Sequence, residues 1–177
     1  YNVNGIRAAM NKGFLDWLAK ESPDVIGLQE IKALETDVEL RVFQDLGYQV
    51  YWYPAVKKGY SGVAILTKVA PKFVHYGMGI SAYDNEGRMI RADFDGFSFI
   101  SAYFPSGTTG DVRQDFKYTF LEDVYGYMQD LKKENLRDNM TNLELVLNTI
   151  QQKLVLHQKN ILVLLSTVLV FITDQIM

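Results

Sequence analysis

The spacing of apolar residues changes twice along this chain of 177 residues, and that change restricts the folds it can adopt. Near the start, Phe14, Leu15 and Leu18 recur at helical spacing among charged residues, and a short apolar run at 25–28 follows as a buried strand. The middle of the chain consists of short β-rich runs between turn residues. Helical spacing returns over residues 113–133. This order predicts an α/β protein with a mixed, partly antiparallel sheet rather than a purely parallel one.

Turn residues and helix breakers set the expected limits of these elements. Pro23 ends the first helix, and Asn4-Gly5 ends an opening strand that we expect to begin a few residues before the first residue of this chain. The dipeptide Asp95-Gly96 predicts a two-residue hairpin turn. The expected strands lie at 48–53, 62–67, 72–76, 88–94 and 97–103, and the expected second helix lies at 36–46, capped by Gly47.

Composition excludes several classes of protein. With 48% hydrophobic and 22% charged residues, the chain belongs among globular domains rather than disordered or fibrous ones. Its formal net charge of −3 argues against a protein that coats nucleic acid through bulk electrostatics, so any nucleic-acid contact must be local. Because the chain has no cysteine, it has no disulfide, zinc–thiolate site or cysteine nucleophile, and we expect it to be cytoplasmic.

The composition shifts after about Glu134. All 13 glycines lie earlier, and residues 135–177 contain no proline and a single aromatic residue, Phe171. We therefore expect a domain at 1–134 and an atypical tail. The tail's apolar stretch at 161–172 is shorter than the roughly 20 residues that a membrane-spanning helix needs, so we expect a buried strand or an abnormal ending and no membrane anchor. A frame-shifted gene and a genuine divergent ending are both open, and the abrupt shift favours the first.

Polar side chains follow the ends of two expected strands. Asn2 and Asn4 lie two apart and share one face, and Glu30 comes directly after the apolar strand and Gln29. Taken singly, Asn-Gly is a common turn and a strand-end glutamate is an ordinary exposed carboxylate. Taken together, one carboxylate and nearby amide oxygens are ligands that Mg²⁺ accepts while it keeps most of its waters. Composition alone does not bring these groups together in space.

Five segments carry a more specific signal than any single residue. They are Asn-Val-Asn-Gly-Ile-Arg at 2–7, Pro-Asp-Val-Ile-Gly-Leu-Gln-Glu-Ile-Lys at 23–32, Gly-Tyr-Ser-Gly-Val-Ala-Ile-Leu-Thr at 59–67, Glu-Gly-Arg at 86–88 and Ala-Tyr-Phe-Pro-Ser-Gly at 102–107. In this order and spacing they closely resemble the exonuclease III family of abasic-site endonucleases. The resemblance covers residues 1 to about 134, about three-quarters of the chain.

The resemblance implies a fold and an activity. The fold would be the first lobe of the four-layer α/β sandwich of the endonuclease/exonuclease/phosphatase superfamily. The activity would be that of a Mg²⁺-dependent DNA phosphodiesterase of base-excision repair, an abasic-site endonuclease and 3′–5′ exodeoxyribonuclease, with Mn²⁺ as an alternative metal. Its partner would be double-stranded DNA with abasic sites or blocked 3′ ends, and we expect a monomer.

The resemblance also implies roles for individual residues. Glu30 would ligate the metal, and Asn4 would lie beside it. Asn2 would belong to the polar network around the scissile phosphate, and Tyr103 resembles the active-site tyrosine of the family. The residues expected to touch or face the DNA backbone are Arg7, Lys12, Tyr60, Arg88 and Lys117. His75 and His157 match no motif, and we expect neither to be catalytic.

The resemblance stops before the family's remaining motifs. Family members continue with an apolar strand followed by Gly-Asp-x-Asn, and later with a Ser-Asp-His segment that activates water. Residues 159–164 resemble that strand, but Leu165-Ser166-Thr167 stands where Gly-Asp-x-Asn should begin. The missing part would also supply a second sheet, so we expect much of the first sheet to lack its usual cover.

We therefore expect this chain to be inactive even though its family is enzymatic. Within enzymes, the alternative is another hydrolase of the superfamily that acts on a smaller phosphodiester. From a different class, a non-catalytic DNA-binding fragment is the alternative, and the negative net charge disfavours it.

Overall fold

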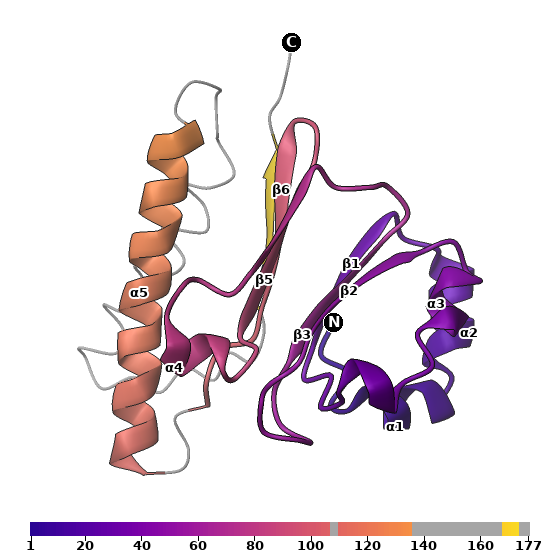
Figure 1. Cartoon of the computed structure of the whole chain (residues 1–177), viewed down its shortest axis with the longest axis horizontal. Coiled ribbons are helices and arrows are strands. Elements are labelled where there is room, and N and C mark those ends of the chain that lie inside the picture. Colours follow the sequence, from indigo (N-terminus) through magenta and orange to yellow (C-terminus); the bar gives the residue numbers. More distant parts are fainter. Residues whose placement is uncertain (107–109, 136–167, 174–177) are drawn as a thin grey trace.

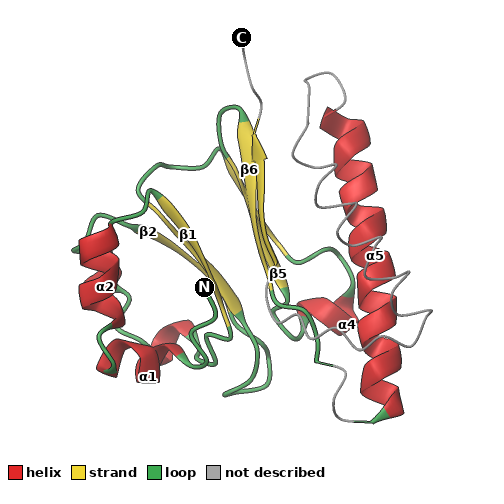
Figure 2. Ribbon diagram, turned by 180° about the vertical axis from the view of Figure 1, so that it is seen from behind, coloured by secondary structure: helices red, strands yellow, loops and turns green. Residues whose placement is uncertain are grey.

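Two β-sheets lie face to face between two layers of helices in the computed structural model, which describes residues 1–106, 110–135 and 168–173 (Figure 1). The helices are α1 (Ile6–Asn11), α2 (Phe14–Glu21), the short 3₁₀ helix η1 (Glu35–Asp37), α3 (Arg41–Gln44), α4 (Ser81–Asp84) and α5 (Asp111–Asn135). The strands are β1 (Val25–Gln29), β2 (Gln49–Tyr53), β3 (Val63–Thr67), β4 (Phe73–Tyr76), β5 (Met89–Asp93), β6 (Phe97–Ala102) and β7 (Val168–Thr173). Helices α1 and α2 cover the outer face of the first sheet, and α4 and α5 cover that of the second (Figure 2).

The first sheet has the strand order β1-β3-β2, and both pairings are antiparallel. The opening segment adds a parallel contact to β1. The Val3 N–H donates to the Gln29 carbonyl at 3.0 Å, and the Gln29 N–H donates to the Tyr1 carbonyl at 3.0 Å. Every residue of β3 is buried, because both faces of this central strand are covered. The sheet is thus mixed and mainly antiparallel, as predicted.

The second sheet has the order β4-β5-β6-β7, and its pairings are antiparallel. A tight hairpin joins β5 to β6. The Phe94 N–H donates to the Phe97 carbonyl at 2.8 Å, and Gly96 has a φ of 79°, a conformation that glycine adopts without strain. The hairpin turn predicted at Asp95-Gly96 is therefore confirmed.

Three apolar clusters fill the spaces between the four layers. Between α1–α3 and the first sheet, the buried side chains include Ile6, Leu18, Leu28, Phe43 and Leu66. Between the two sheets they are Val63, Ile65, Ile90, Ala92, Phe94 and Phe99. Between the second sheet and α5 they include Met89, Ile100, Phe120, Val124 and Met128. The fold of the four-layer α/β sandwich is confirmed by this layering, although the resemblance implied only its first lobe.

The prediction of one continuous helix at 36–46 was wrong. The structure has η1 and the short α3 there, separated by Val38, which is extended with φ −132° and ψ 134°. The Asp37 carboxylate accepts a hydrogen bond from the Leu34 N–H at 3.2 Å, and this local bond competes with a continuous helix. The apolar spacing still marked a buried face, since Phe43 is fully buried.

The expectation that the first sheet would lack a second sheet to cover it was also wrong. Strands β4, β5 and β6 come from this chain, and their side chains close the inner face of β3. The tail adds β7 beside β6, and this strand overlaps the apolar stretch at 161–172, where a buried strand was one of the two expectations. The strand expected at 159–164 and His157 lie outside the described residues. No helix in the described ranges combines the length and apolar character needed to cross a membrane.

Candidate functional site

A cluster of polar residues lies where β1 ends beside the opening segment. Glu30 and Lys32 follow β1 with φ values of 55° and 50°, and Asn4 has a φ of 46°. Left-handed backbone at non-glycine residues costs on the order of 1 kcal/mol or more each and tends to gather at functional sites. The segments are held together by the Gly5 N–H, which donates to the Glu30 carbonyl at 2.7 Å, and by the Ile6 N–H, which donates to the Ile31 carbonyl at 3.0 Å.

The Glu30 carboxylate is the centre of this cluster. Asn2 Nδ2 donates to Glu30 Oε1 at 2.6 Å, and Lys32 Nζ lies 2.8 Å from Glu30 Oε2. Lys32 Nζ also donates to Asn4 Oδ1 at 2.6 Å, while the Asn4 N–H donates to Asn2 Oδ1 at 3.0 Å. The structure thus brings Asn2, Asn4 and Glu30 together. It adds Lys32, which lies in a matched motif but received no role from the sequence.

Tyr103, which follows β6, completes the cluster from the second sheet. Burial raises the pKa of Tyr103 to about 12. The adjacent Glu30 carboxylate, which forms a hydrogen bond with the phenol, raises this pKa further than burial alone would. Burial alone would raise the pKa of Glu30, but the hydrogen bonds from Asn2, Lys32 and Tyr103 outweigh it and hold that pKa below its usual value. At neutral pH, Glu30 is therefore an anion and Tyr103 a neutral donor.

Arg88, for which a contact with DNA phosphate was predicted, is buried in the structure. Its side chain is 2% exposed. Nη1 donates to the Tyr103 carbonyl at 3.1 Å, Nη2 donates to the Tyr60 hydroxyl at 2.9 Å, and the guanidinium lies 4.8 Å from the centre of the Tyr103 ring. The buried charge of Arg88 is compensated by Glu86, which accepts hydrogen bonds from Arg88 Nε at 2.9 Å and Nη2 at 2.6 Å. Arg88 therefore holds two tyrosines from within the fold.

Sequence reasoning missed two members of this network, Glu86 and Arg113. From the first turn of α5, Arg113 Nη1 donates to Glu86 Oε1 at 3.0 Å, and Nη2 donates to the Tyr60 hydroxyl at 2.9 Å. Burial would raise the pKa of Glu86, but hydrogen bonds from the two arginines outweigh it and lower that pKa. The signal in the sequence was the opposite charge two residues before Arg88, inside a matched motif.

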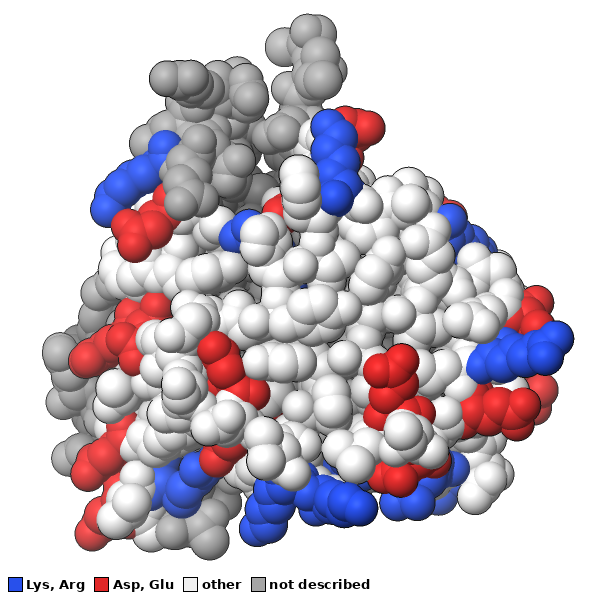
Figure 3. Space-filling model, in the orientation of Figure 1, with Lys and Arg blue, Asp and Glu red and all other residues white. Residues whose placement is uncertain are grey.

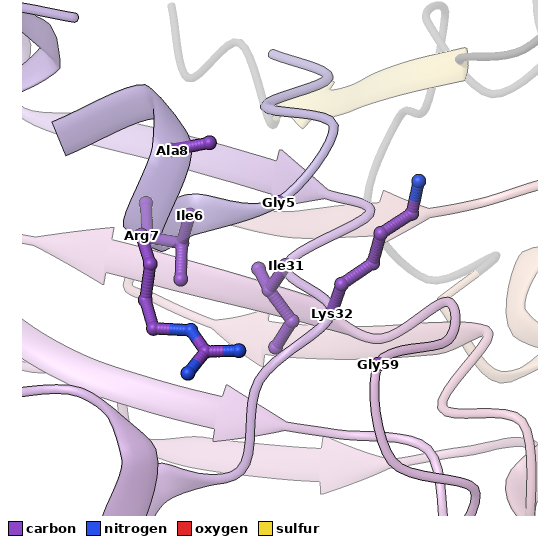
Figure 4. Close-up of a pocket in the computed structure, with 7 residues that line it drawn as sticks. All are labelled: Gly5, Ile6, Arg7, Ala8, Ile31, Lys32 and Gly59. Atoms are coloured by element: carbon purple, nitrogen blue, oxygen red, sulfur yellow. The ribbon is translucent and has the colours of Figure 1, made fainter. Parts of the chain in front are cut away.

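The other predicted DNA-facing residues lie at the surface to different degrees. Arg7 and Lys12 are exposed on or next to α1, Tyr60 is half-buried in the network just described, and Lys117 is half-buried on α5. On the face drawn in Figure 3, several basic side chains lie next to one another along the lower edge, and basic and acidic side chains are interspersed elsewhere. Arg7 and Lys32 line one cavity of about 300 Å³, together with Gly5, Ile6, Ala8, Ile31 and Gly59 (Figure 4).

The donor set around Glu30 fits a hard divalent cation. The Glu30 carboxylate and the Asn4 amide oxygen already converge on one cation, the ammonium of Lys32. Among the described residues no group of three or more His, Cys, Asp or Glu side chains lies close enough to hold a metal ion. Mg²⁺ accepts one or two protein carboxylates and completes its shell with water and substrate phosphate. Glu30 and Asn4 are thus the residues that could hold such an ion.

The fold and this site define a four-layer α/β protein with a polar cluster around Glu30 at the edge of its first sheet. Residues 1–153 match the endonuclease/exonuclease/phosphatase family, and the chain belongs to this family.

Relatives of known name agree with the motifs. The chain is 40% identical over 135 residues to an exodeoxyribonuclease of Bacillus subtilis, a match that covers 76% of this chain and 52% of the relative. It is 41% identical over 130 residues to the DNA repair nuclease APEX1 of Danio rerio, a match that covers 72% of this chain and 42% of the relative. The chain thus spans about half the length of the curated relatives it matches. The resemblance to exonuclease III and abasic-site endonucleases is confirmed.

Solved structures agree with the fold. An AP endonuclease from Archaeoglobus fulgidus superimposes with a TM-score of 0.66 at 32% identity, over 73% of this chain and 49% of that protein. A 3′ phosphatase from Neisseria, bound to a product DNA hairpin, superimposes with a TM-score of 0.67 at 26% identity, over 75% of this chain and 51% of that protein.

Proposed function

We propose that this chain carries the metal-binding side of a Mg²⁺-dependent DNA phosphodiesterase that cleaves the backbone at abasic sites and trims blocked 3′ ends. The observation that carries the proposal is the Glu30 carboxylate, ionised and surrounded by Asn2, Asn4 and Tyr103 at one edge of the sheet. The names of the relatives, exodeoxyribonuclease and DNA repair nuclease, support DNA as the substrate. The absence of cysteine fits a reducing compartment such as the cytoplasm, and the proposed protein acts as a monomer.

Each residue of the cluster has a distinct part in this proposal. Glu30 and Asn4 would hold Mg²⁺, or Mn²⁺ in its place, and a bound metal polarises a phosphoryl oxygen and offsets its developing charge. Asn2 fixes the orientation of the Glu30 carboxylate through its 2.6 Å hydrogen bond. Tyr103, which stays protonated at neutral pH, would donate a hydrogen bond to phosphate.

The chain as it stands would not complete the reaction. Hydrolysis needs a base that removes a proton from the attacking water, and the Gly-Asp-x-Asn and Ser-Asp-His segments are absent from the sequence. His75 Nε2 pairs with Asp93 at 2.9 Å on the β4–β5 ladder, outside the Glu30 cluster. We therefore expect at most trace cleavage of an abasic duplex by the 177-residue chain in Mg²⁺.

A chimera tests the retained half directly. Residues 1–134 are joined to the part of the Bacillus subtilis exodeoxyribonuclease that this chain does not match, and abasic-site cleavage is measured in Mg²⁺. We expect cleavage by the chimera, and a loss on the order of a hundredfold or more in Glu30→Gln, because the carboxylate ligand is removed. The matched control is Glu35→Gln, at an exposed position of η1, which should cleave like the parent chimera. A folded chimera whose cleavage ignores Glu30→Gln would disprove the proposal.

A further inference from the structure

The ammonium of Lys32 occupies the place between Glu30 and Asn4. Lys32 Nζ lies 2.8 Å from Glu30 Oε2 and 2.6 Å from Asn4 Oδ1. These are the two oxygens that the proposed function gives to the divalent cation, and the present inference rests on that proposal. We propose that Lys32 is a built-in counter-ion of the site, which a divalent cation must displace before it can bind.

The geometry makes the two cations mutually exclusive. A Mg²⁺ ion held by these oxygens would lie about 2.1 Å from each, in the space next to the ammonium. Two like charges at such a separation repel strongly where solvent is partly excluded. The side chain of Glu30 is only 15% exposed, so water screens this repulsion incompletely. Glu30 and Asn4 can therefore bind either the Lys32 ammonium or the metal ion, but not both at once.

Lys32 is built to release its ammonium without unfolding the loop. The Lys32 N–H donates to the Ser61 carbonyl at 2.9 Å, and the preceding Ile31 N–H donates to the Gly62 carbonyl at 3.2 Å, so the backbone is anchored. The side chain is 31% exposed and lines the cavity of about 300 Å³, where it extends away from Arg7 (Figure 4). A long, flexible side chain beside open space can leave its partners by rotation alone.

Removal of the competing ammonium should strengthen cation binding. The affinity for Mn²⁺ is measured by calorimetry without DNA on the full chain and on Lys32→Met, which keeps the length of the side chain and removes its charge. We expect Lys32→Met to bind on the order of tenfold tighter, or about 1.4 kcal/mol. Lys32→Arg keeps a competing cation and should stay within about threefold of the wild type.

A control variant separates displacement from a general gain in negative charge. Lys58→Met removes one positive charge next to Gly59, which lines the same cavity, at an exposed position. Its affinity should stay within about twofold of the wild type, because a screened charge contributes little. The site of binding is checked by NMR, since bound Mn²⁺ should broaden the side-chain amide signal of Asn4 in each variant.

The outcomes distinguish this inference from the proposed function. If Lys32→Met and the wild type bind equally, with Asn4 broadened in both, the displacement is refuted while Glu30 and Asn4 remain the metal ligands. If Lys58→Met gains as much as Lys32→Met, the effect is net charge and the displacement is likewise refuted. If the side-chain amide signal of Asn4 is not broadened in any variant, both the displacement and the assignment of Asn4 as a metal ligand are refuted.

Discussion

At the scale of single residues, Glu86 is the carboxylate on which two arginines depend. Its Oε2 accepts from Arg88 Nη2 at 2.6 Å, and its Oε1 accepts from Arg113 Nη1 at 3.0 Å. Arg88 is buried, and a buried charge without a partner is strongly destabilising. Because Arg88 also contacts Tyr103, and Tyr103 contacts Glu30, the network supports the candidate site from within the fold.

The substitution Glu86→Gln should destabilise the protein by about 3 kcal/mol at pH 7, because the buried Arg88 loses its counter-ion. The pKa of Glu86 is lowered in the folded chain, so its stabilisation is present above the unfolded carboxyl pKa, about 4.3, and is lost as pH falls through the lower folded value. Urea unfolding of both proteins from pH 7 to pH 3 measures this. The difference between the two unfolding free energies should shrink as the pH falls below about 4.3. A difference that stays constant with pH would contradict the role of the Glu86 charge.

Residues of the site could be predicted from sequence only where their motif was specific. The placement of Asn2, Glu30 and Tyr103 followed from motifs at the ends of strands, and the structure brings them together. The role of Lys32 was not predicted, because its contact with Asn4 depends on left-handed backbone at both residues. The burial of Arg88 was not predicted either, because arginine is usually exposed and only the fold brings Glu86 and Arg113 close to one another and to Arg88.

At the scale of elements, strands were easier to predict than helices. Strands β2, β3, β5 and β6 were predicted within two residues at each end, because short β-rich runs between turn residues specify a strand locally. The prediction of a helix at 36–46 was wrong, because its periodic apolar residues also fit two short helical segments that bury Phe43. The pairing of two sheets escaped prediction, since it depends on contacts between residues far apart in the chain.

The close approach of β1 and β6 gives a test at this scale. A Cβ added at Gly27 would lie 2.8 Å from Ser101 Cβ and 3.1 Å from the Phe99 ring, so Gly27→Ala should force the sheets apart and cost about 2 kcal/mol. Gly126 on α5 has nothing within 4 Å of an added Cβ, so Gly126→Ala should stabilise by about 0.5–1 kcal/mol. Urea midpoints of the two variants should move in opposite directions. Destabilisation of equal size in both would contradict the proposed contact.

At the scale of the whole molecule, charge limits how DNA can bind. The net charge is −3, and on the face drawn in Figure 3 the basic side chains that lie next to one another are confined to the lower edge. Arg88 and Arg113 are committed to Glu86. Arg7 and Lys32 line one cavity beside the candidate site, and Lys12 lines a second one together with Asn2. Phosphate contacts should therefore be few and local.

Binding of an abasic duplex should accordingly be weak, should fall gradually with added salt and should be coupled to the metal. With few phosphate contacts, the slope of log affinity against log salt should be shallow, and Arg7→Met should reduce it by about 1. Mg²⁺ should raise the affinity, because Glu30 and Asn4 supply too few ligands and substrate phosphate completes the shell of the ion. Fluorescence titrations at several salt concentrations, with and without Mg²⁺, measure both effects. Arg41→Met, an exposed position on α3 paired with Asp45, serves as the control for loss of charge. Tight binding that ignores salt, Mg²⁺ and Arg7 would show that this half of the fold does not engage DNA through the candidate site.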